Sequence, residues 1–166
     1  MPFTPYHFGP NGLLGSFFFR WLNLPALVLV NVAVDLESLT VIIFNIRKYP
    51  EHGFFHSFAG ATVIALLFCL VYVPVKKPIN DLMGFMGLKQ SNTLSSIVLA
   101  SVLGAWMHVL LDSCLYRDIM PFFPSDYNPM YGLMTPPEMR FFCIAAGGLA
   151  VVVFVVRGVL KKNRGA

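Results

Sequence analysis

Long apolar stretches, each close to the length of a membrane-spanning helix, recur along the chain and limit what it can fold into. An α-helix needs about 20 mainly apolar residues to cross the hydrocarbon core of a bilayer. The 166 residues are 57% hydrophobic and only 12% charged, whereas soluble domains carry roughly 25% charged residues. We therefore predict an all-α, polytopic integral membrane protein that forms a single domain.

Proline, glycine and polar clusters divide the chain into membrane-embedded segments. The first is short and rich in glycine and proline, so we expect a re-entrant or tilted helix packed on the protein. The third is expected to stop at "VPVKKP", before a polar stretch with room for a short interfacial helix. Four to five embedded helices are predicted, over about 8–20, 25–46, 55–75, 93–115 and 141–160.

Basic residues gather at the ends of the apolar segments, which indicates membrane topology and argues against nucleic-acid binding. With Lys161, Lys162 and Arg164 in the cytoplasm, most of the 12 lysines and arginines fall at the inner face. Arg47 and Lys48 fall outside and argue mildly for the opposite orientation. We predict a cytoplasmic C-terminus.

The titratable residues are few, and several fall inside or at the ends of predicted spans. An ionisable group at membrane depth costs at least ~2.5–3.5 kcal/mol on insertion scales and by default marks a functional site. In the predicted orientation the histidines and three carboxylates meet near the outer face, where a metal ion would compensate them. These residues are His7, Asp35, Glu37, His56, His108 and Asp112.

The stretch "HVLLD" carries the strongest single signal. His108 and Asp112 are four residues apart, so they share one helix face, and imidazole with carboxylate suits zinc, manganese or iron. On the preceding acidic helix, Asp35 and Glu37 lie about 200° apart. Both reach one site only if that helix is distorted or the site holds more than one ion.

Other interpretations of these residues stay open. His52, beside Glu51 in a polar connector, is equally well explained as a hydrogen-bonded residue at headgroup level. The intramembrane His108–Asp112 pair also fits a proton relay or a structural hydrogen bond.

A family resemblance adds to this interpretation. "HGFFHS", the acidic "DLE", the early His7 and the "HVLLD" helix before a proline-rich loop resemble the LexA-regulated, membrane-bound metal-dependent hydrolases of bacteria. That family is similar in motif to zinc-dependent phospholipases C. The resemblance covers roughly residues 1–130 and implies a bacterial inner-membrane protein.

The resemblance also implies a ligand set of His7, Asp35, His56, His108 and Asp112, with Glu37 as a further candidate. One position departs from the family, which often has His-Arg-Gly-Phe-x-His. Here Glu51 stands at the first position and His52 follows, so either residue is a candidate additional ligand. Asp118, in the proline-rich loop, is a candidate ligand or orienting residue, or simply part of a solvated loop.

We therefore predict metal-dependent hydrolysis of a lipid or phosphoester, with one or more divalent transition-metal ions, zinc first among them. The ion would activate a water molecule, and Glu37 or Asp112 would act as general base. The main alternative is a metal-ion or proton-coupled transporter using the same residues. A third is a non-catalytic scaffold that retains a metal. The oligomeric state stays open.

Overall fold

The computed structural model of the chain describes residues 4–46 and 49–164, and side chains within 5–46 and 49–160. Arg47 and Lys48, which the charge count places outside, lie beyond the described residues. All regular secondary structure in the described residues is helical, with no strand, so the predicted all-α class is confirmed. The elements are α1 (Thr4–Phe17), α2 (Leu24–Ile43), the short 3-10 helix η1 (Phe54–His56), α3 (Phe58–Phe85), α4 (Leu94–Ser113) and α5 (Pro136–Arg164).

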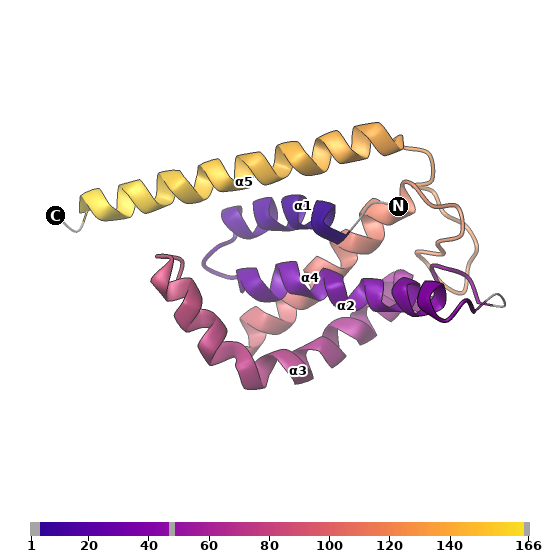
Figure 1. Cartoon of the computed structure of the whole chain (residues 1–166), viewed down its shortest axis with the longest axis horizontal. Coiled ribbons are helices and arrows are strands. Elements are labelled where there is room, and N and C mark those ends of the chain that lie inside the picture. The colour runs from indigo at the N-terminus through magenta and orange to yellow at the C-terminus, as the bar shows by residue number, and fades with distance from the viewer. Residues whose placement is uncertain (1–3, 47–48, 165–166) are drawn as a thin grey trace.

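The helices alternate in direction between two ends of the molecule (Figure 1). Helices α1, α3 and α5 start at the end that holds the loop before α5, and α2 and α4 return to it. Helix α4 packs against α2 and α3, while α1 lies between α2 and α5. We call the end at which α1, α3 and α5 start, together with the loop 114–135, the loop end. The opposite end is the far end.

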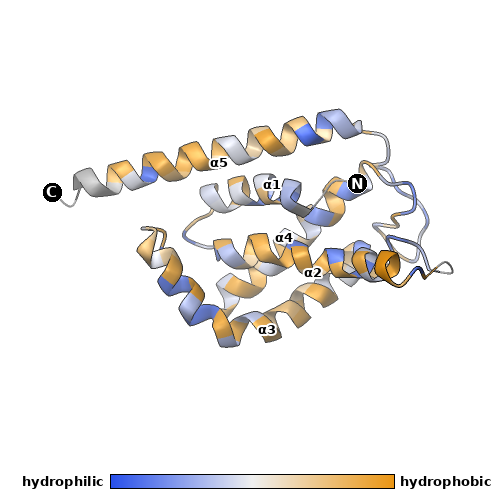
Figure 2. Ribbon diagram, viewed as in Figure 1, coloured by the Kyte–Doolittle hydropathy of each residue, from blue (hydrophilic) through white to orange (hydrophobic). Residues whose placement is uncertain are grey.

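Four of the helices are long and apolar enough to cross a membrane, namely α2, α3, α4 and α5. Their outer surfaces are apolar along most of their length (Figure 2). Leu70, Val71 and Phe141 expose 71%, 73% and 75% of their surface. Apolar exposure on this scale marks a surface covered by something other than water, and the predicted membrane protein is confirmed at this level.

Helix α1 begins at Thr4 and ends at Phe17, earlier at both ends than the predicted 8–20. Pro5 fits in the first turn because an N–H there has no helical partner, which explains the early start. At 14 residues the helix is about 21 Å long. It is the short N-terminal helix that the sequence predicts, and it is not among the four candidate spans.

Helix α5 begins at Pro136, five residues before the predicted start. Glu138 Oε2 accepts hydrogen bonds from the Thr135 backbone N–H and hydroxyl, each at 2.7 Å, a capping-box arrangement. The "TPPE" stretch therefore starts this helix, although the prolines suggest a loop.

The prediction that the third helix stops at "VPVKKP" is wrong, because α3 continues through Pro74 and Pro78 to Phe85. A proline removes one helical hydrogen bond and bends a helix without necessarily ending it. The bend is visible in Figure 1, and the hydrophilic residues after it in Figure 2. The first limb, about 27 Å over 58–75, already matches the bilayer core.

Glycines allow two close helix crossings that fix the bundle. A Cβ on Gly9 would collide with the backbone of Cys143, and one on Gly147 would lie 3.4 Å from Gly9 Cα. A Cβ on Gly104 of α4 would likewise collide with the Leu27 carbonyl of α2. Helices α1 and α5 are thus in backbone contact, as small residues permit within membranes.

Candidate metal centre

The side chains predicted as ligands are delivered to the loop end by separate elements. Asp35 lies about 17 Å along α2 from Leu24, and His108 about 21 Å along α4 from Leu94, at a rise of 1.5 Å per residue. His56 ends η1, and Ser57 alone separates it from the start of α3. The reversal of direction between successive helices therefore brings these positions to one depth.

Four of these residues form one compact group, Asp35, His56, His108 and Asp112, which we call the metal-site group. Each offers one ligand atom, and all four atoms lie within 4.8 Å of one another. The two histidine side chains are fully buried, and Asp112 exposes 4% of its side chain. Asp35 exposes 25%, so it forms the accessible edge of the group.

His108 sits at the centre with unsatisfied ring nitrogens. Its Nε2 lies 3.3 Å from Asp35 Oδ1 and 3.3 Å from Asp112 Oδ2, yet neither contact has hydrogen-bond geometry, and both ring nitrogens are buried without a hydrogen-bond partner. A buried polar atom without a partner costs free energy. A cation between Nε2 and the two carboxylates would satisfy this nitrogen.

The orientation of His56 is fixed by Glu37. Its Nδ1 donates to Glu37 Oε2 at 2.8 Å, because a carboxylate only accepts, so Nε2 keeps its lone pair. Ser38 Oγ, 3.5 Å from that Nε2, donates its own proton to the Glu51 carbonyl. Burial lowers the pKa of His56, which favours the neutral ring that a metal requires.

The carboxylate of Glu37 is fixed by hydrogen bonds to both of its oxygens. Its Oε2 also accepts from the Gly53 N–H at 3.2 Å, and its Oε1 accepts from Tyr49 Oη at 2.7 Å and the Phe55 N–H at 3.3 Å. Burial and the Glu37 carboxylate raise the pKa of Tyr49, which keeps it a donor. The two acids of α2 therefore serve one centre from opposite helix faces, Asp35 directly and Glu37 through His56.

His7 reaches the group from α1. Its Nε2 donates to Asp112 Oδ1 at 3.0 Å, and its ring stacks on that of His108 with centroids 4.1 Å apart. Asn11, one turn further along α1, joins it to α2 by a 3.0 Å hydrogen bond to Asn31. His7 thus contacts a member of the metal-site group without belonging to it.

His52 and Asp118 pair with each other above the group. His52 Nδ1 lies 3.0 Å from Asp118 Oδ2, and its ring is 4.9 Å from that of His56 and 4.2 Å from that of Tyr116. The connector before η1 is thereby tied to the loop end. The Glu51 side chain is exposed, and it is the Glu51 backbone carbonyl that accepts a hydrogen bond, from Ser38 Oγ.

No family model, curated protein or solved structure matches the chain.

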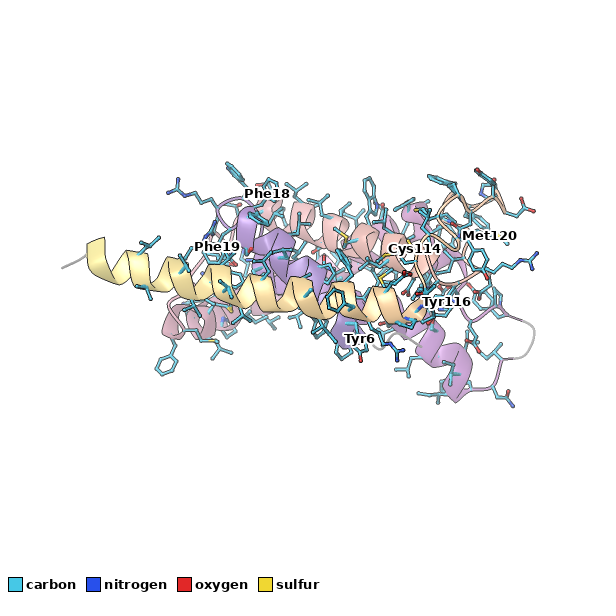
Figure 3. The ribbon with its side chains drawn as sticks, turned by 90° about the horizontal axis from the view of Figure 1, so that it is seen from above. Tyr6, Phe18, Phe19, Cys114, Tyr116 and Met120 are labelled. Carbon is cyan, nitrogen blue, oxygen red and sulfur yellow. The ribbon has the colours of Figure 1, made fainter. Side chains whose placement is uncertain are left out.

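The loop 114–135 closes this end of the bundle. The Phe58 N–H donates to the Pro121 carbonyl at 3.0 Å, and the Phe54 and Phe123 rings meet edge to face. Figure 3 shows Cys114, Tyr116 and Met120 gathered at this end, with Phe18 and Phe19 toward the other. The loop therefore covers the end of the bundle at which the metal-site group lies.

Sequence reasoning missed Tyr49, which bonds Glu37 from the connector. A tyrosine twelve residues after an acid carries no periodic signal, because the intervening turn decides whether they meet. It also did not identify the Glu51 carbonyl as the hydrogen-bond partner of Ser38, three residues after Asp35.

Proposed function

We propose that the protein is a membrane-embedded, metal-dependent hydrolase that acts on a lipid or phosphoester. The observation that carries this proposal is the buried metal-site group, in which two carboxylates and two imidazoles converge within 4.8 Å. Catalytic zinc sites use three protein ligands of this kind and leave a fourth position to water or substrate. The motifs that resemble the bacterial metal-dependent hydrolases include all four of these residues.

The ligand chemistry fits a divalent transition metal, with zinc as the first choice. His56 and His108 supply nitrogen, and Asp35 and Asp112 supply oxygen. Glu37 behind His56 has the arrangement common at metal sites, where a carboxylate orients the ligating ring through its other nitrogen. A bound ion would provide a Lewis acid and a water molecule of lowered pKa.

The protein's own residues have distinct roles in this proposal. Glu37 positions His56, and its four accepted hydrogen bonds leave it poorly placed to take a proton from substrate. His7 positions Asp112 by donating to Oδ1. Asp35 is the most exposed member of the group, so it is the carboxylate that would meet substrate and act as general base, with Asp112 the other candidate.

A site at one end of the bundle supports hydrolysis more than transport. At the far end, Gln90 donates to the Phe19 and Leu22 carbonyls at 2.8 and 3.0 Å, and Asn23 bonds Asn92 and Tyr72. A transport pathway would have to cross this hydrogen-bonded layer.

We also propose that the protein lies in a bacterial inner membrane, with the site on the outer side and the C-terminus in the cytoplasm.

Elemental mass spectrometry of detergent-purified protein tests the proposal. We expect stoichiometric zinc or another transition metal in the wild type and its loss in Asp35→Ala and His108→Ala. The matched control, Asp126→Ala in the exposed loop, should keep the metal. The same preparations should hydrolyse a phospholipid or a chromogenic phosphodiester only when metal is present. A wild type that binds no metal after repletion would refute the hydrolase.

A further inference from the structure

We propose that a groove between α2 and α3 binds a hydrocarbon tail of a membrane lipid, and that this lipid is the substrate of the metal centre. The identity of the lipid as substrate rests on the proposed function. The binding of a tail in the groove does not, because it follows from the shape and polarity of the groove alone.

The groove has a volume of about 660 Å³, within the range of small-molecule sites. Its walls come from α2, the connector after it, and α3. On α2 it extends from Ala33 to Val41, a distance of about 12 Å. It therefore runs along the helix axes, in the direction that a lipid tail takes across a leaflet.

The polarity of the groove changes along its length as that of a lipid does. Glu37, Thr40 and Tyr49 line the part toward the loop end, whereas Ala33 and Val71 line the part nearer the middle of the bundle. The polar groups are already engaged, since Tyr49 bonds Glu37 and Thr40 bonds the Leu36 carbonyl. An occupant therefore meets apolar surface almost throughout, which suits hydrocarbon.

The groove is continuous with the lipid-facing surface. Leu36, Leu67 and Val71 line it and expose 53%, 50% and 73% of their surface, and both flanking helices are candidate membrane spans. Lipid tails are the material that a bilayer presents to such a surface. We therefore assign the groove to a lipid tail and not to a soluble apolar molecule.

Glu37 connects the groove to a member of the metal-site group. Glu37 lines the groove, and its Oε2 accepts the hydrogen bond from His56 Nδ1. Phe55, which also lines the groove, donates its backbone N–H to the same carboxylate. A lipid with its tail here has its headgroup at the depth of the connector, beside the residues that hold His56.

Native mass spectrometry of the purified full chain tests the proposal, with phosphatidylglycerol carrying palmitoyl or hexanoyl chains as the probe. We expect the wild type to retain the palmitoyl lipid and to bind the hexanoyl lipid at least about tenfold more weakly. Ala33→Phe, which places a ring in the groove, should lose the palmitoyl lipid by a similar factor, and Ala33→Leu should lose less. Val32→Phe is the matched control, since Val32 is 44% exposed on the same helix and does not line the groove.

The outcomes separate this inference from the metal hydrolase. His108→Ala should lose the metal and keep the lipid, because lipid binding in the groove does not depend on the metal. A wild-type protein that binds no metal but retains the lipid would refute only the hydrolase. Equal binding of both chain lengths, or full retention in an Ala33→Phe protein that elutes as wild type, would overturn the groove assignment. A dimer without lipid adducts would assign the groove to a second copy and overturn it as well.

Discussion

The Nδ1 atom of His56 lies 2.8 Å from Glu37 Oε2, although Glu37 projects from α2 on the side away from Asp35. The connector after α2 folds back and carries η1, so His56 bonds Glu37 while one of its ring nitrogens lies within 4.8 Å of an Asp35 carboxylate oxygen. Two carboxylates on opposite faces of a regular helix thus reach one group of side chains without distortion of that helix.

Loss of the Glu37 carboxylate should weaken metal binding without abolishing it. Glu37→Gln should lower metal affinity about 10- to 100-fold, the usual effect of removing an orienting partner. Tyr49→Phe should give a smaller loss in the same direction, because it removes one of four hydrogen bonds to Glu37. Competition with a fluorescent zinc chelator measures both. Asp81→Asn, on the second limb of α3, is the control, and an unchanged affinity in Glu37→Gln would contradict the assigned role.

Asp112 and Asp118, which both contact histidines, should behave differently on substitution. Asp112→Asn should lose the metal, because Asp112 belongs to the metal-site group. The substitution replaces a charged carboxylate ligand by a neutral amide. Asp118→Asn should keep it, since Asp118 bonds His52 at the rim and exposes 43% of its side chain. Metal content of both purified variants is the measurement. A metal-free Asp118→Asn protein would make Asp118 part of the centre.

Metal removal should destabilise the bundle. A ligand that binds only the folded state stabilises it by about 2.7 kcal/mol at 100 times its dissociation constant. Chelation should therefore lower the unfolding temperature in detergent, and added zinc should restore it. In His108→Ala the unfolding temperature should not respond to chelator or zinc. A response there equal to that of the wild type would point to metal binding elsewhere.

The close crossing of α1 and α5 should tolerate no added methyl group. Gly9→Ala should destabilise the protein by about 1–3 kcal/mol, the usual cost of overpacking, because its Cβ would collide with the Cys143 backbone. Gly148→Ala is the matched control, since nothing lies within 4 Å of a Cβ there. Thermal unfolding in detergent compares them, and equal midpoints would show that the crossing can relax.

The sequence was sufficient for the fold class and for the convergence of the acids and histidines at one depth. Both follow from apolar length and from the alternation of direction that spanning helices impose. Residues 108 and 112 share a face in any α-helix, so their pairing could be predicted without a structure.

What the sequence could not supply depends on irregular backbone. The pairing of Glu37 with His56 requires the return path of the connector, which no helical period encodes. The pairing of His52 with Asp118 joins segments 66 residues apart. The continuation of α3 beyond Pro74 was missed because a proline that bends a helix and one that ends it look alike in sequence.

The backbone contact between Gly9 and Cys143 also bears on biogenesis. Helix α5 supplies none of the metal-site group, yet it is the surface against which α1, and with it His7, is seated. During synthesis the first helix emerges long before the last. The centre should therefore reach its final geometry only once α5 has joined the bundle, and a chain cut short before residue 136 would present the ligands without the support of His7.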